Sequence, residues 1–198
     1  YFISGESISK CKISPQAEFV ESKGYEVLYL TDEIDEFVLQ ILMDYDGKAF
    51  KSVNQGDLDL IDEETKEEIK KKGEESKDLL EAIKEALSDQ VDDVRLSSRL
   101  VNHPVCLVSE DGLSFEMEKV LNSLPDNPEE IKAQRILEIN PNHEILKSLE
   151  KIHDSKPDLL NEYADILYDQ ACLIEGLPIE DPVKFSQKIA NLMIESSK

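Results

Sequence analysis

Short apolar runs in the first part of the chain are spaced like strands separated by helices. Residues 1–4, 26–30 and 49–53 each concentrate apolar side chains over four or five positions, which is typical of short buried strands. The longer intervals between these runs contain helix signals. A strand and helix order of this kind predicts a small α/β layer over residues 1–62.

Two helices are predicted within this layer from their ends and their periodicity. Ser14 followed by Pro15 predicts a helix start, because serine caps the first turn and proline fits the first helical position. Gly24 predicts the end of that helix, since glycine readily adopts the left-handed conformation of a C-terminal cap. Residues 34–42 repeat apolar side chains with a helical period, and Asp32 is their predicted N-cap.

The middle of the chain mixes strand and helix patterns. Residues 91–96, 105–108 and 135–139 predict three strands, because each is a short apolar run bounded by polar or turn residues. Residues 113–124 predict the helix between the second and third of these strands. This part of the chain is therefore predicted to be α+β, with a three-stranded sheet.

The last part of the chain is predicted to be helical. Residues 143–153, 157–175 and 183–196 carry apolar residues at three- and four-residue spacing, and Gly176 begins the connector before the last helix. The last two helices are apolar on more than one side, so each needs more than one packing partner. A four-helix bundle made by two copies of the chain satisfies that need, and a core within one chain is the alternative.

An acidic segment joins the two predicted parts. Residues 62–93 contain 13 acidic and 6 basic residues in 32 positions, which is typical of a solvated helix face. We predict a first unit at residues 1–62 and a C-terminal dimerisation unit at residues 63–198, which begins with a hinge-like acidic helix at 63–90. The predicted fold class is α+β: a small α/β subdomain, then an α+β domain whose C-terminal helices form a dimer bundle.

The net charge of the chain limits the kinds of molecule that it is expected to bind. The chain has 198 residues, with 22 Lys and Arg against 44 Asp and Glu, and a formal charge of −22. Nucleic acids and anionic membranes are therefore not expected as partners, because few cations are available to neutralise phosphates. Cys11, Cys106 and Cys172 lie far apart and form no CxxC pair, so we expect reduced thiols in a cytoplasmic protein.

No residue pattern predicts a catalytic or metal site. The seven glycines never form a GxGxxG or GxxxxGKS/T phosphate loop. His103, His143 and His153 lack partners at the spacing of a zinc site. Carboxylate pairs arise by chance in so acidic a chain, and a hydrolase built from scattered carboxylates is a weak alternative. We predict no catalytic residue, no bound metal and no cofactor within this chain.

Several long runs are specific enough to carry a family resemblance. The first group is YFISGES at 1–7, SPQAEFVESKGYEVLYLTDEIDEFVLQ at 14–40 and DGKAFKSV at 46–53. The second group is DVRLSSRLVNHPVCLVS at 93–109, MEKVL at 117–121, RILEINPNHEI at 135–145 and LYDQACLIEGLPIEDPVKF at 167–185. The first group resembles the end of the middle domain of the heat-shock protein 90 chaperones. The second resembles their C-terminal domain, and the amino-acid sequence of both groups is closest to that of bacterial members.

The resemblance implies a homodimeric, ATP-driven chaperone whose clients are unfolded or partly folded proteins. In that family ATP and magnesium bind in an N-terminal domain, and a catalytic-loop arginine lies earlier in the middle domain. This chain resembles neither region, so we expect no ATPase activity from it. It ends in ESSK rather than the MEEVD tail of eukaryotic cytosolic members, so no tetratricopeptide co-chaperone is expected. An acidic protein-interaction scaffold without chaperone activity is the alternative.

The resemblance and the apolar patterns together indicate two candidate surfaces. The expected dimer contact lies on the last two helices and includes Leu167, Ala171, Ile174, Phe185, Ile189, Leu192 and Met193. The family also places an exposed amphipathic helix near residues 113–121. Its expected client contacts are Leu113, Phe115, Met117, Val120 and Leu121, of which Met117 matches the family's exposed positions best. Methionine suits such a surface because its flexible side chain adapts to irregular partners.

Overall fold

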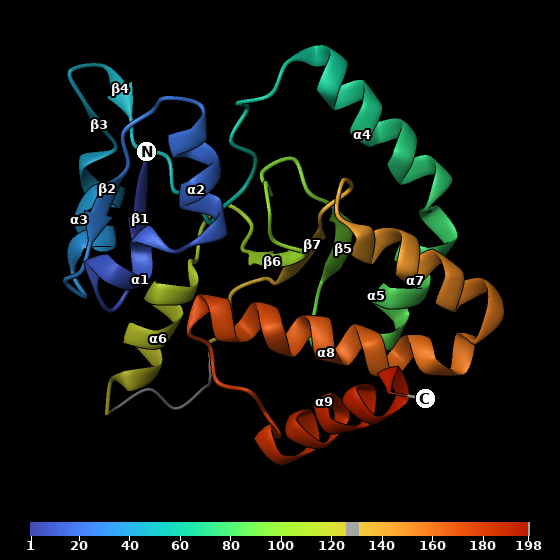
Figure 1. Cartoon of the computed structure of the whole chain (residues 1–198). Helices are drawn as coiled ribbons and strands as arrows, with labels where there is room; N and C mark the ends of the chain where they lie inside the picture. The colour runs from blue at the N-terminus through green and yellow to red at the C-terminus, as the bar shows by residue number, and fades with distance from the viewer. Residues whose placement is uncertain (126–130, 198) are drawn as a thin grey trace.

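The computed structural model describes residues 1–125 and 131–197, which form two packed parts (Figure 1). The N-terminal unit, residues 1–62, contains short strands and short helices at one side of the molecule (Figure 1). The C-terminal unit, from residue 63 onward, contains the larger sheet and the long helices.

The N-terminal unit is built on a parallel strand pair. β1 (Phe2–Ser4) pairs in parallel with β2 (Leu28–Leu30). The other elements are α1 (Ile8–Lys12), α2 (Pro15–Ser22), α3 (Asp35–Leu42) and the antiparallel hairpin of β3 (Asp44–Tyr45) and β4 (Lys48–Ala49). The strand predicted at 49–53 is therefore divided, because Ala49 belongs to the hairpin whereas Ser52 forms a bridge to Phe2.

Local sequence signals explain where α2 begins and ends. The Ser14 side chain accepts a hydrogen bond from a first-turn amide, Pro15 occupies the first turn, and Gly24 adopts a φ of +81° just after the helix. These three predictions are confirmed. The prediction for Asp32 is wrong, because α3 begins at Asp35 and the Asp32 amide donates to the Asp35 carboxylate at 3.1 Å.

The C-terminal unit contains the predicted three-stranded sheet. Its strand order is β5 (Asp93–Leu96), β7 (Ile136–Ile139) and β6 (Val105–Val108), with β7 parallel to β5 and antiparallel to β6. Its helices are α4 (Glu63–Glu75), α5 (Lys77–Ala86), α6 (Phe115–Ser123), α7 (Glu144–Ser155), α8 (Pro157–Glu175) and α9 (Pro182–Ser196). The α+β fold class is confirmed, and the predictions for β6 and α8 agree with the structure residue for residue.

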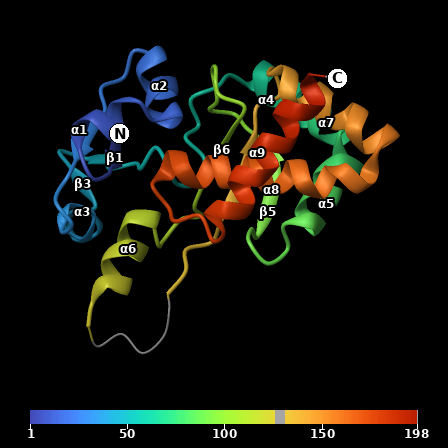
Figure 2. The ribbon, with the colours of Figure 1, turned by 60° about the horizontal axis from the view of Figure 1, so that its bottom comes forward.

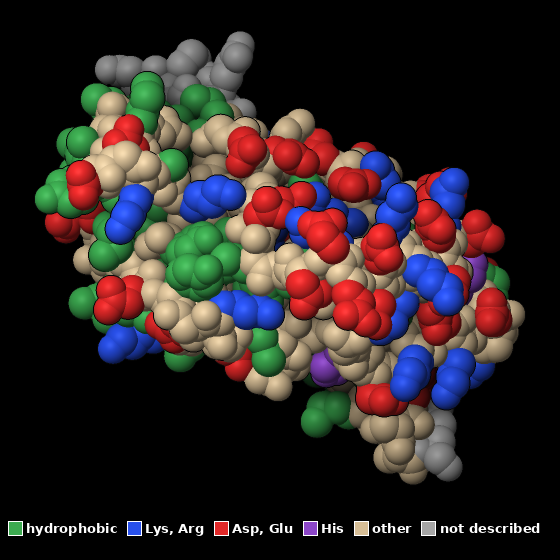
Figure 3. Space-filling model, turned by 90° about the horizontal axis from the view of Figure 1, so that it is seen from above, with side chains coloured by type: hydrophobic (Ala, Val, Ile, Leu, Met, Phe, Trp, Pro, Cys, Tyr) green, Lys and Arg blue, Asp and Glu red, His purple; other side chains and the backbone are tan. Residues whose placement is uncertain are grey.

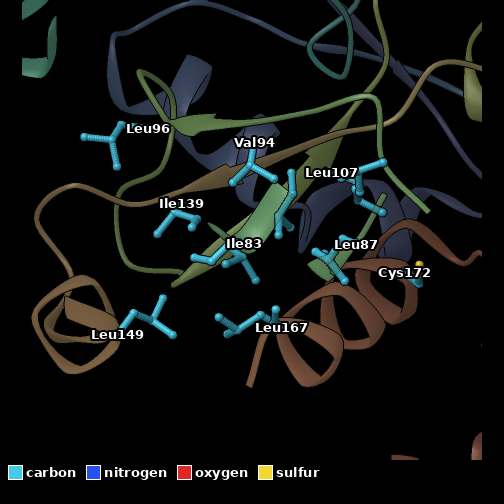
Figure 4. Close-up of a cluster of buried hydrophobic side chains, with 14 of the residues drawn as sticks. Ile83, Leu87, Val94, Leu96, Leu107, Ile139, Leu149, Leu167 and Cys172 are labelled. Carbon is cyan, nitrogen blue, oxygen red and sulfur yellow. The ribbon is translucent and has the colours of Figure 1, made fainter. Parts of the chain in front are cut away.

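The main hydrophobic core lies between the sheet and the long helices. α8 packs across β6, while α5 and α7 pack beside α8. Figure 4 shows Leu149 of α7 and Leu167 of α8 gathered with Ile83 of α5, and none of the three is more than 4% exposed. Burying side chains of this size contributes about 1.5 to 3 kcal/mol each, so this layer is the main source of stability.

α4 is a charged helix on the surface. None of its 13 residues, all of which the structure describes, is buried. The helix runs without a break through Gly73, and Ser76 separates it from α5. The single acidic helix predicted at 63–90 is therefore two helices. Figure 3 shows acidic and basic side chains crowded together over this half of the molecule.

A partly buried carboxylate connects the end of α8 to the N-terminal unit. Glu175 accepts hydrogen bonds from Gln16 Nε2 at 2.6 Å and from Asn54 Nδ2 at 3.0 Å. Loss of solvation on burial raises the pKa of the Glu175 carboxyl to about 7. The two amide hydrogen bonds and the nearby Lys119 ammonium oppose this rise in the pKa.

We expect Glu175→Gln to change how stability depends on pH. Because the folded-state pKa of about 7 lies above the usual 4.5, the folded protein binds this proton more tightly than the unfolded chain does. The parent therefore loses stability as the pH rises between these two values. Glu175→Gln removes that loss, so the stability of the variant relative to the parent should increase by about 2 kcal/mol between about pH 5.5 and about pH 8.

Urea unfolding of both proteins at the two pH values measures this difference. Glu74→Gln, on the exposed surface of α4, is the matched control and should keep the pH dependence of the parent. A constant difference between Glu175→Gln and the parent across this pH range would contradict the prediction.

Candidate functional site

α9 packs against α8 with one of its faces. Figure 2 shows α9 lying across α8. The packed face repeats at three- and four-residue spacing and consists of Phe185, Lys188, Ile189 and Leu192. Lys188 is the most buried of these residues, and its ammonium forms an ion pair with Asp165 of α8. Because an unpaired buried charge is costly, this pair fixes α9 in place on α8.

The opposite face of α9 carries an exposed apolar stripe. Val183, Ala190, Met193 and Ile194 fall on one side of the helix by their spacing, and we call them the outer stripe. Val183, Met193 and Ile194 are 67%, 68% and 56% exposed. An aligned apolar surface of this kind is a candidate contact surface for another protein.

The residues predicted for the dimer contact do not all lie on this stripe. Two are in the core of the chain, at 4% and 0% exposure: Leu167 and Ala171. Three are half-buried on the packed face: Phe185, Ile189 and Leu192. Ile174 and Met193 are 39% and 68% exposed and are accessible to a partner. The prediction did not include the exposed Val183 and Ile194, whose spacing from Ala190 is visible in the sequence.

The N-terminal end of α6 is firmly fixed to the rest of the chain. Ser114 caps the helix by accepting from a first-turn amide, and its hydroxyl donates to Glu36 of α3. Phe115 is 3% exposed in the main core, and the Arg135 guanidinium carbon lies 5.7 Å from the centre of its ring. Glu118 accepts from Arg135 Nη2 at 2.6 Å. Phe115 is thus a core residue, and we leave it out of the client surface proposed below.

A cavity of about 390 Å³ lies between α6 and α3, and we call it the α3–α6 groove. Its lining is mostly polar: five carboxylates, including Glu36 of α3, and an ammonium surround Met117 and Val120 of α6. Met117 is only 7% exposed, and its Sδ accepts a hydrogen bond from Gln40 Nε2 at 3.1 Å. The predicted client residues that are partly exposed are Leu113, Val120 and Leu121.

The contact between α3 and α6 crosses from one unit to the other. Burial raises the pKa of the Glu36 carboxyl above its usual range, and the hydrogen bond from Ser114 acts in the opposite direction. Gln40 Nε2 also donates to the Gly112 carbonyl at 3.2 Å, just before α6. These contacts hold the two helices together, so the groove has one wall in each unit.

α3 turns its apolar side chains away from the protein. Ile34, Val38 and Ile41 are 65%, 48% and 83% exposed, whereas Glu36 is 7% exposed. The exposed surface continues through further large apolar side chains at the end of α3 and in the hairpin: Leu42, Met43 and Tyr45. Figure 3 shows hydrophobic side chains gathered at this end of the molecule. Periodicity predicted this helix, but not that its apolar side would be exposed.

The described residues were also searched for other kinds of site. They contain no group of three or more His, Cys, Asp or Glu side chains placed to hold a metal ion. Within residues 1–125 and 131–197, no helix is both long and apolar enough to cross a bilayer. The three cysteines are free thiols, and all of them are buried. Apolar side chains are exposed on the outer stripe and on one side of α3, and the α3–α6 groove has a mixed lining that is mostly acidic.

The comparisons with a family model and with known proteins indicate the same family. The family model described as Hsp90 protein matches residues 1–198. Chaperone protein HtpG of Clostridium acetobutylicum is 51% identical over 193 residues, which cover 98% of this chain and 30% of that protein. Chaperone protein HtpG of Bacillus subtilis strain 168 is 44% identical over 194 residues, or 98% of this chain and 31% of that protein. The chain spans about 30% of the length of these relatives, and it belongs to the Hsp90 protein family.

Proposed function

We propose that this chain is the part of an Hsp90-type chaperone that joins two copies into a dimer and contacts client proteins. The outer stripe of α9 carries the dimer proposal, because it is an aligned apolar surface left open by a single chain. A two-fold contact uses the same patch on both copies, so the α8–α9 pairs of two chains complete a four-helix bundle. Sedimentation of the chain over a range of concentrations tests the dimer directly.

Two neighbouring surfaces support client contact. In the α3–α6 groove Val120 and the nearly buried Met117 lie among charged side chains, and the exposed apolar side of α3 continues into Met43 of the hairpin. Unfolded or partly folded proteins expose irregular apolar segments, and methionine adapts to such partners. The charge of −22 keeps these surfaces in solution and attracts basic clients, an effect that weakens as salt is added.

ATP hydrolysis is not part of the function proposed for this chain. The seven glycines are dispersed and form no GxGxxG or GxxxxGKS/T loop, so we propose no nucleotide site in this chain. We assign any nucleotide-dependent step to parts of the longer relatives that this chain does not cover. Nucleic acids, membranes and tetratricopeptide co-chaperones are not among the proposed partners, and the proposed location is cytoplasmic.

Replacing Val120 and Leu121 together with serine should weaken client binding about threefold to tenfold, because both contribute apolar contact area. Both are partly exposed on α6, so the fold and the dimer should be retained. Fluorescence anisotropy with a labelled, permanently unfolded protein measures the affinity, and circular dichroism checks the fold.

The matched control replaces Ile8 and Ile13, which are 53% and 77% exposed, with serine. Neither residue lines the groove, although Ile13 lines a neighbouring cavity. This variant should bind the unfolded protein as the parent does. Equal weakening by both double variants would indicate nonspecific apolar attraction and would count against the proposed surface.

A further inference from the structure

A short segment at the junction pairs with both units. The Val53 amide donates to the Phe2 carbonyl at 2.9 Å, beside β1 of the N-terminal unit. The Gly56 amide donates to the Ser109 carbonyl at 3.0 Å, just beyond β6 of the C-terminal unit. Residues 51–56, which we call the bridging segment, therefore link the two sheets through backbone hydrogen bonds.

Arg99 holds the bridging segment from the side of the C-terminal unit. The Arg99 side chain is fully buried. Its Nη1 donates to the Val53 carbonyl at 3.0 Å, and its Nη2 donates to the Gly56 carbonyl. Its Nε donates to Glu138 Oε2 of β7 at 3.1 Å. Because a guanidinium is planar and rigid, these contacts fix the bridging segment relative to β7, which a single flexible ammonium would not do.

The close approach at this point also depends on a glycine. Gly56 has a φ of +45°, and a Cβ added to it would lie 2.5 Å from Asp111 Oδ1. The exposed Asp111 side chain can rotate away from an added Cβ, so the constraint is the left-handed backbone, which strongly disfavours a β-branched residue. Arg99 thus fixes the position of the bridging segment, and Gly56 allows its backbone conformation.

We infer that Arg99 is a positioning residue, which holds the N-terminal unit in one orientation on the C-terminal unit. Other contacts across the junction include Glu175 with Gln16 and Asn54, and Gln40 with Met117 and the Gly112 carbonyl. Arg99 instead joins two backbone carbonyls and a carboxylate in one buried group. Because the α3–α6 groove has one wall in each unit, this orientation also sets the shape of the groove. The relevance to clients rests on the proposed function, whereas the positioning itself does not.

Arg99→Gln tests the inference in the whole chain. It should speed amide exchange at Val53, Gly56 and Ser109 by about tenfold or more, since loss of charged hydrogen bonds favours local opening. Exchange in the centre of β7, at Leu137, should change much less. Spin labels at Lys48→Cys and Lys151→Cys, in chain diluted with unlabelled chain, should report a broader distribution of distances between the units.

Arg95→Gln is the matched control. Arg95 Nη2 also donates to Glu138, at 2.8 Å. Its ion pair with Asp57, at 3.5 Å, reaches the N-terminal unit too, but Asp57 is 77% exposed and such pairs contribute little. This variant should keep the exchange rates of the bridging segment and the distance distribution of the parent. If Arg99→Gln also keeps them, or accelerates exchange equally at Leu137, Arg99 does not position the units and the inference is overturned.

Gly56→Val provides a second test that leaves Arg99 in place, and it decides the question should Arg99→Gln fail to fold. The substitution should move the bridging segment and reproduce both the faster local exchange and the broader distance distribution. Parent-like values for both measurements would show that the orientation does not depend on this segment, and the inference would fail.

Discussion

Phe115→Ala should lower the free energy of unfolding by about 3 to 5 kcal/mol. The ring is 3% exposed and packs in the main core, below the Arg135 guanidinium. Its removal loses the transfer free energy of a large apolar side chain and leaves a cavity, because the sheet on which it packs collapses only in part. The contact of the guanidinium with the ring face is lost as well.

Chemical denaturation of the parent and the variant measures this loss. Leu124→Ala is a suitable control, since Leu124 follows the same helix but is 53% exposed, and it should change stability by less than about 1 kcal/mol. A Phe115→Ala variant that unfolds like the parent but binds unfolded proteins more weakly would show that the ring serves clients rather than the core.

Elements whose ends are marked by special residues could be predicted to the residue. α8 is the clearest case, because Pro157 occupies the first turn and Gly176, at a φ of +66°, ends the helix. The prediction for α3 was less exact. Acidic residues are frequent before this helix, and a helix start at Asp32 or at Asp35 is equally compatible with its apolar period.

The direction of an apolar face could not be predicted from the periodicity of its helix. α9 has two such faces, and only the packing of Leu192 on α8 shows which one is left open. α3 has one apolar side, which the structure leaves exposed, while Glu36 on the other side is buried against Ser114. In both helices, residues far away in the sequence determine which face is buried and which is exposed.

The exposed residues of α6 could not be predicted for the same reason. The apolar pattern predicted this helix, but its rotation depends on the Ser114 cap, the contact with Glu36 and the burial of Phe115. With this rotation Met117 lies against Gln40, and Val120 lies nearer to the solvent along the groove. The helix could therefore be predicted from the sequence, whereas the residues that it offers to a partner could not.

Met193→Ser together with Ile194→Ser should weaken the dimer at least about 100-fold. Met193 and Ile194 are 68% and 56% exposed in a single chain, and both lie on the outer stripe of α9. Two-fold symmetry doubles every substitution, so four apolar side chains are lost from each dimer. A loss of only about 0.7 kcal/mol for each side chain corresponds to a 100-fold change, because about 1.4 kcal/mol is a factor of ten in affinity.

Analytical ultracentrifugation across a concentration series measures the dissociation constant, and circular dichroism shows whether α9 is still folded. Lys184→Ser with Gln187→Ser is the matched control, because it places two serines at exposed polar positions of the same helix and should leave the dimer intact. Neither substitution in the test pair touches the Lys188–Asp165 contact or Leu192, so α9 should stay attached to α8. A test variant that dissociates at the same concentration as the parent would place the contact between copies elsewhere on the chain.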